Sequence, residues 1–119
     1  MATVLVVDDD PGFLALAARV LEGMGATVVA TVEDPASARA AAEDNRPEAM
    51  LVDVGLENGG GIELAHELAS LPWGPRVVLI SSDSDAGRAV AAFDGTRHVP
   101  FVPKEELASD TLRELLLGT

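Results

Sequence analysis

The sequence predicts an α/β domain built as a doubly wound, five-stranded parallel sheet, and two observations lead to this fold class. Short β-branched runs alternate along the chain with longer segments rich in alanine and leucine, as strands and helices do in repeated βα units. Strands such as "TVLVV" and "VVLI" are apolar at consecutive positions, which is typical of strands that are covered on both faces. With 119 residues, 48% of them hydrophobic, the chain is long enough for one core.

Five strands and five helices are expected in alternation, and local signals place their ends. "DP" makes Asp10 the N-cap of the first helix with Pro11 as its first residue, and "EDP" does the same with Asp34 and Pro35 for the second helix. An apolar stripe on the first helix should cover one face of the sheet: Phe13, Ala17, Val20, Leu21 and Met24. The expected strands are residues 3–7, 27–31, 49–52, 77–81 and 100–103. The expected helices are residues 11–24, 35–45, 61–71, 85–93 and 109–117.

Composition excludes several classes of function. The formal charge of −12, from 20 acidic residues against 8 Lys and Arg, argues against direct binding of nucleic acid by this chain. The absence of cysteine excludes disulfides, thiolate metal sites and cysteine catalysis. The N-terminus "MATVLVVDDD" has no basic segment, and no apolar stretch approaches the ~20 residues that a membrane span needs. We therefore expect a cytoplasmic protein without a membrane span.

Polar side chains follow four of the five expected strands. Asp8 and Asp9 come after the first, Asp53 after the third, Ser81 at the end of the fourth and Lys104 after the fifth. The carboxyl ends of parallel strands meet at one edge of the sheet, so these side chains should gather there. Three carboxylates without histidine or cysteine suit Mg²⁺, and a lysine opposite them suggests an incoming anion.

With these residues in view, the whole chain resembles a receiver domain of the two-component response regulators. "VVDDD" resembles the acidic pair of that family, "MLVDVGLENGGGIEL" its phospho-acceptor strand and loop, "VVLISS" its Thr/Ser strand, and "FVPK" its aromatic residue and lysine. The resemblance covers residues 3–117, and the combined order and spacing of the motifs is specific. It implies a flavodoxin-like (βα)5 fold with strand order 2-1-3-4-5. It also implies that residues 1–119 form one receiver domain, either stand-alone or cut from a longer regulator.

The resemblance implies a phosphoryl-accepting switch and not an enzyme with a separate substrate. Asp53 would accept a phosphoryl group from a phosphohistidine on a sensor histidine kinase or a phosphotransfer protein. Asp8 and Asp9 would hold Mg²⁺ together with Asp53 and the backbone carbonyl of Gly55. The domain would catalyse its own phosphorylation and a slow autodephosphorylation.

The remaining implied roles concern the response to the phosphoryl group. Lys104 would pair with Asp53 or its phosphoryl group, and Ser81 would hydrogen-bond a phosphoryl oxygen. Phe101 would be the aromatic residue whose position reports the state, and Asp83 would tune hydrolysis. The signal would pass to an output domain or a downstream protein through the face of the fourth helix, fifth strand and fifth helix.

The chain departs from the family pattern at three places. Glu57 stands where a proline commonly follows the acceptor, within the glycine-rich "ENGGG". Glu105 follows Lys104 where the family usually has a proline, and we expect a trans bond there because a non-proline cis bond costs about 3 to 4 kcal/mol. The fourth helix has only Val90 and Phe93 as large apolar residues.

Two rival classes share parts of this pattern. A haloacid-dehalogenase-like phosphatase also has an aspartate nucleophile after its first strand, and Asp8 with Asp10 forms a similar D-x-D pattern. Pro11 favours a capping role for Asp10, however, and 119 residues is short for that class. A flavodoxin-like or dinucleotide-binding module would need backbone amides in a Gly- or Ser/Thr-rich loop after the first strand, where this chain has "DDDPGF".

Overall fold

The computed structural model describes residues 2–56, 60–83, 85–92 and 99–118. Its strands are β1 (Thr3–Val7), β2 (Thr27–Val32), β3 (Ala49–Asp53), β4 (Arg76–Ser81) and β5 (Phe101–Pro103). Its helices are α1 (Pro11–Gly23), α2 (Pro35–Asn45), α3 (Gly61–Ala69), α4 (Ala86–Ala92) and α5 (Asp110–Leu117). A short 3-10 turn, η2 (Lys104–Glu106), follows β5. Within the described residues, no helix is long and apolar enough to cross a bilayer.

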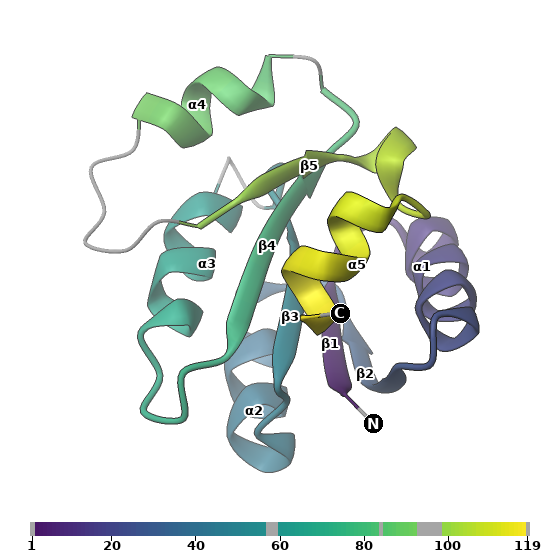
Figure 1. Cartoon of the computed structure of the whole chain (residues 1–119). Helices are drawn as coiled ribbons and strands as arrows, with labels where there is room; N and C mark the ends of the chain where they lie inside the picture. Colours follow the sequence, from purple (N-terminus) through teal and green to yellow (C-terminus); the bar gives the residue numbers. More distant parts are fainter. Residues whose placement is uncertain (1, 57–59, 84, 93–98, 119) are drawn as a thin grey trace.

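The described strands form one parallel sheet in the order β2-β1-β3-β4-β5, which confirms the predicted fold class and strand order. Helices α1 and α5 lie on one face of the sheet, and α2 and α3 lie on the other (Figure 1). This order places β1 and β3 side by side at the centre, with β4 next to β3. The carboxyl ends of the central strands therefore meet at one edge, where the polar residues were expected.

Each central strand contributes side chains to both hydrophobic cores. On β1, Leu5 packs with the α2 and α3 side while Val4 and Val6 pack with the α1 and α5 side, and all three are fully buried. On β3, Met50 and Leu51 divide between the two cores in the same way. Burial on both faces thus accounts for the consecutive apolar residues of these strands.

The helix caps follow the prediction. The Asp10 carboxylate accepts the Gly12 N–H at 3.0 Å at the start of α1. The Asp34 carboxylate accepts the Ser37 N–H at 2.8 Å at the start of α2. Both aspartates have extended backbones, as N-cap residues do. Asp10 is therefore occupied in starting α1.

Helix ends differ from expectation by one or two residues. Helix α3 ends at Ala69 and not at Leu71, because the Leu71 N–H bonds the Leu68 carbonyl in a tighter turn. Ser109 precedes α5 as its N-cap and accepts the Leu112 N–H at 3.2 Å. The sequence also did not predict η2, and residue 93 at the expected end of the fourth helix lies outside the described residues.

Trp73 lies between α3 and β4, at the end of the sheet opposite the carboxyl ends of the strands. Its indole N–H donates to the Pro47 carbonyl at 2.9 Å, and its ring packs against the core beside α2 and α3. The Arg46 guanidinium lies 5.4 Å from the ring centroid. These contacts give Trp73 a packing role remote from the polar edge.

Candidate functional site

Buried polar side chains gather at the carboxyl edge of the sheet. Asp8, Asp53 and Ser81 are only 0%, 6% and 6% exposed, and in the described part of the chain they are the buried polar or charged residues. The Asp8 N–H donates to the Val32 carbonyl at 3.0 Å, so β2 holds the backbone where β1 ends. Burial of three polar groups at one edge is costly unless they have partners, and it marks this edge as a candidate site.

The three carboxylates expected to hold a cation lie together. One oxygen each from Asp8, Asp9 and Asp53 falls within 4.8 Å of the others. Asp9 is exposed while the other two are buried, so the cluster opens to solvent on one side. Hard oxygen donors in such a group, with room for water ligands, fit Mg²⁺.

Lys104 supplies the positive charge beside this cluster. Its Nζ lies 2.7 Å from Asp8 Oδ2 and 3.7 Å from Asp53 Oδ1. The other Asp8 oxygen, Oδ1, accepts the Asp10 N–H at 2.9 Å. Both oxygens of the fully buried Asp8 thus have a partner, whereas Asp53 has a more distant cation.

The pKa of Asp53 is raised above its ordinary value of 3.8. Burial is the main cause, because it disfavours the charged form, and the neighbouring negative charge of Asp8 adds to it. Lys104 and the backbone N–H of Gly55 act in the opposite direction, and Asp9 contributes a smaller increase. Added positive charge beside Asp53 would therefore favour its charged form.

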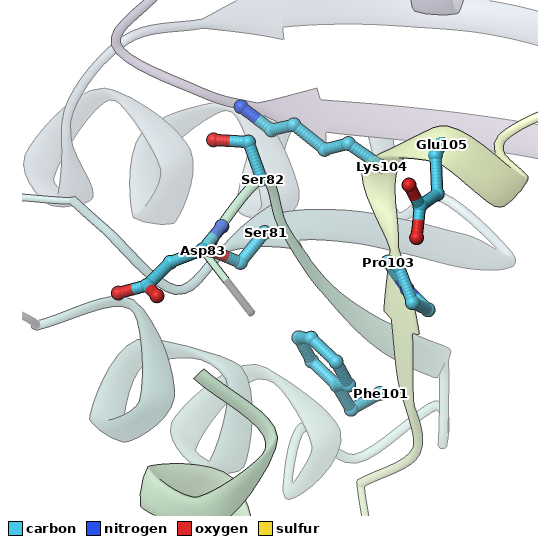
Figure 2. A pocket seen from close by; sticks show the side chains of 7 residues that line it. All are labelled: Ser81, Ser82, Asp83, Phe101, Pro103, Lys104 and Glu105. Atoms are coloured by element: carbon cyan, nitrogen blue, oxygen red, sulfur yellow. Dashed lines mark hydrogen bonds between the residues drawn. The ribbon is translucent and has the colours of Figure 1, made fainter. Parts of the chain in front are cut away.

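A pocket of about 350 Å³ opens beside the cluster. Its lining residues are Ser81, Ser82, Asp83, Phe101, Pro103, Lys104 and Glu105. Figure 2 shows Lys104 and Phe101 leaving the same stretch of chain toward different sides of this pocket. The pocket thus extends from Lys104, which lies beside the acidic cluster, to Phe101 on β5.

Ser81 and Asp83 are linked by a backbone contact at the end of β4. The Ser81 Oγ accepts the Asp83 N–H at 2.9 Å, which leaves the hydroxyl hydrogen able to donate elsewhere. The exposed Asp83 carboxylate accepts the Asp85 N–H at 2.9 Å. In the structure, Asp83 therefore organises the turn that leads into α4.

Phe101 is half-buried and packs against the core beside α3. A β-carbon placed on Gly87 of α4 would lie 3.7 Å from its ring, so the ring is in close range of that helix. The small residues of α4 leave only Ala86 buried in this helix among those described. The ring therefore lies between the sheet and a helix that buries few of its side chains.

Four further positions named in the sequence analysis remain: Gly55, Glu57, Phe93 and the Lys104–Glu105 peptide bond. Gly55 is exposed in the turn after Asp53, and the Lys104–Glu105 peptide bond is trans, as predicted. Glu57 and the Phe93 side chain lie outside the described residues.

The sequence did not indicate the site contacts of Phe13 and Gly61. The Lys104 Nζ lies 4.3 Å from the Phe13 ring centroid, and Gly61 packs against the Asp53 backbone. The glycine run before α3 was a usable signal for the second contact, whereas Phe13 looked only like a core residue.

The family model of the response regulator receiver domain matches residues 4–116 of the chain. The DNA-binding response regulator MtrA of Mycolicibacterium smegmatis is 30% identical over 109 residues, which cover 88% of this chain and 47% of MtrA. The chain spans about half the length of the curated relatives that match along most of it.

Solved structures show the same fold. A two-component response regulator of the LuxR family from Aurantimonas sp. SI85-9A1 matches with a TM-score of 0.78 at 23% identity, over 95% of this chain and 81% of that chain. A CheY-like receiver domain protein from Methanospirillum hungatei JF-1 matches with a TM-score of 0.73 at 21% identity, over 97% and 94% of the two chains.

Proposed function

Because the chain belongs to the response regulator receiver domain family, we propose that it is a phosphorylation-dependent switch in which Asp53 is the phospho-acceptor. The donor is a phosphohistidine on a sensor histidine kinase or a phosphotransfer protein. The observation that carries this proposal is the position of Asp53, buried between two further carboxylates and a lysine at the carboxyl edge of the sheet. Residues 1–119 act as a receiver domain, alone or within a longer regulator.

In the proposed reaction, an Asp53 carboxylate oxygen forms a bond to phosphorus while the phosphorus–nitrogen bond of the phosphohistidine breaks and its electron pair stays on the imidazole. Asp8, Asp9, Asp53 and the Gly55 carbonyl would hold Mg²⁺, whose charge, when it is bound, neutralises the phosphoryl group. Lys104 would then contact a phosphoryl oxygen from its position 3.7 Å from the Asp53 carboxylate.

The response to the phosphoryl group is proposed to run through the pocket beside the site. The Ser81 hydroxyl would donate to a phosphoryl oxygen, and Phe101 would change its position between the sheet and α4. Asp83, which lines the pocket, would tune hydrolysis of the acyl phosphate. These movements would alter the face formed by α4, β5 and α5.

The partner is proposed to bind at that face. Arg88, Glu105 and Arg113 are exposed there, and this mixture of charges suits a protein partner such as an output domain or a downstream protein. Arg97, in the segment between α4 and β5, lies outside the described residues. The net charge of −12 supports a role without direct nucleic-acid binding. We also propose a cytoplasmic location.

Intact mass after incubation with a small phosphodonor tests the acceptor. The wild type should gain one phosphoryl group only when Mg²⁺ is present, and Asp53→Asn should abolish the gain. Asp10→Asn is the matched control, because asparagine also caps helices and the label should remain. Continued labelling of Asp53→Asn, with Asp8→Asn blocking it instead, would favour the phosphatase class.

A further inference from the structure

The ring of Phe13, on α1, faces the ammonium group of Lys104, with Nζ 4.3 Å from the ring centroid. We propose that Phe13 is a positioning residue for Lys104, whose ring face holds the ammonium beside the two buried carboxylates. Only the consequence for phosphoryl transfer rests on the proposed function. The contact itself is a property of the fold and can be tested without a metal or a phosphodonor.

Three elements converge on the ammonium. Asp8 follows β1 and lies 2.7 Å away, Asp53 ends β3 and lies 3.7 Å away, and Phe13 approaches from α1. Lysine carries its charge on a flexible four-carbon stem, so a single ion pair still leaves the side chain many conformations. A ring face together with two carboxylates restricts the ammonium to one region of the edge.

The surroundings favour a ring in particular. The faces of aromatic rings carry negative charge density that attracts a cation, and this attraction grows when water is excluded. Phe13 is 9% exposed, Asp8 is fully buried and the Lys104 side chain is 17% exposed, so little water reaches the contact. An aliphatic residue of similar size would exclude water equally well but would not attract the ammonium.

The contact has a consequence for the proposed reaction. The Lys104 ammonium lies nearer to Asp8 than to Asp53, and the centroid of the Phe13 ring lies 4.3 Å from it. Without the ring, the lysine should sample more positions and should meet a phosphoryl group on Asp53 less often. Beryllofluoride with Mg²⁺ imitates an acyl phosphate. We expect Phe13→Leu to weaken its binding by about 2- to 30-fold, the range that corresponds to one cation–π contact.

The chain offers a direct probe of this contact, because Lys104 is its only lysine. An aromatic ring at this distance should move the NMR signals of the Lys104 ε-CH2 protons upfield, and no second lysine overlaps them. Phe13→Leu should return these signals toward those of a free lysine, whereas Phe13→Tyr should preserve the upfield shift. Leu14→Val, which also alters a buried residue of α1, is the matched control and should leave the shift in place.

A double-mutant cycle gives an independent measure. Phe13→Leu, Lys104→Met and the double variant are unfolded in urea without Mg²⁺. The double variant should lose less stability than the two single losses together, with a coupling of about 2- to 30-fold in the unfolding equilibrium constant. The lysine signals decide the question if Lys104→Met fails to fold.

The outcomes separate the two proposals. Lysine signals that do not move in Phe13→Leu, or fully additive losses, would overturn the positioning role even if Asp53 still takes up a phosphoryl group. Failure of the wild type to be labelled would overturn the proposed function, while a ring-dependent lysine shift would still support the contact. Equal beryllofluoride binding by the wild type and Phe13→Leu would remove the consequence for the reaction.

Discussion

Gly61, the first residue of α3, packs its backbone directly against the backbone of Asp53. A β-carbon at position 61 would overlap the Asp53 carbonyl oxygen and would lie 2.9 Å from the Asp53 carbonyl carbon and 3.0 Å from that of Val54. Only glycine allows so close an approach of two backbones. The start of α3 and the position of the proposed acceptor are therefore coupled through this one contact.

Gly61→Ala should destabilise the protein by about 1 to 3 kcal/mol or more, because a backbone segment and not a flexible side chain would have to move. Urea unfolding measures the loss. Gly23→Ala is the matched control, since its β-carbon would meet nothing within 4 Å and it lies at the end of a helix. Equal stability of the two variants would contradict the tight contact at position 61.

The raised pKa of Asp53 makes the effect of Asp53→Asn depend on pH. Between the ordinary value of 3.8 and the higher folded-state pKa, the folded state binds more protons, so stability falls as pH rises through this window. Asparagine does not ionise, so Asp53→Asn does not lose stability in this window. Without metal, Asp53→Asn should raise the melting temperature at about pH 7 and give little gain below the unfolded pKa.

Thermal unfolding across this pH range checks the prediction. Glu22→Gln, at an exposed position on α1, is the control and should show no comparable gain. A gain in Asp53→Asn that stays constant from acid to neutral pH would show that the ionisation of Asp53 is not its cause.

Mg²⁺ should stabilise the wild type through the cluster of Asp8, Asp9 and Asp53. A ligand that binds only the folded state adds about 2.7 kcal/mol at 100 times its Kd. Millimolar MgCl₂ should therefore raise the melting temperature, and the increase should be smaller in Asp53→Asn. NaCl at equal ionic strength controls for screening of the acidic surface. An identical response to the two salts would contradict the metal site.

Beryllofluoride with Mg²⁺ imitates the acyl phosphate and should reveal the switch by amide NMR. Shifts should begin at Asp53 and Ser81 and extend to Phe101 and α4, because Ser81 and Phe101 line one pocket and the Phe101 ring lies close to Gly87 of α4. The Trp73 indole should stay nearly still, since it lies at the other end of the sheet and is bonded to the Pro47 carbonyl. Shifts confined to the loops after β1 and β3 would indicate a site that is not coupled to the α4 side.

The amino-acid sequence by itself determined the features that depend on local signals. Consecutive apolar residues predicted strands buried on both faces, and Asp10 and Asp34 predicted the starts of two helices, because these effects act within a few residues along the chain. It also predicted that Asp8, Asp53, Ser81 and Lys104 would share one edge, since parallel strands end on the same side.

Only the tertiary structure decided how those residues meet. It placed the Lys104 ammonium nearer to Asp8 than to Asp53, put the Phe13 ring beside it, and brought Gly61 against the Asp53 backbone. These relationships depend on the packing of α1 and α3 against opposite faces of the sheet, within a few ångströms, and no pattern along the chain encodes such distances. The charge on Asp53 is set in the same way, because burial and neighbouring charges arise only when distant segments pack together.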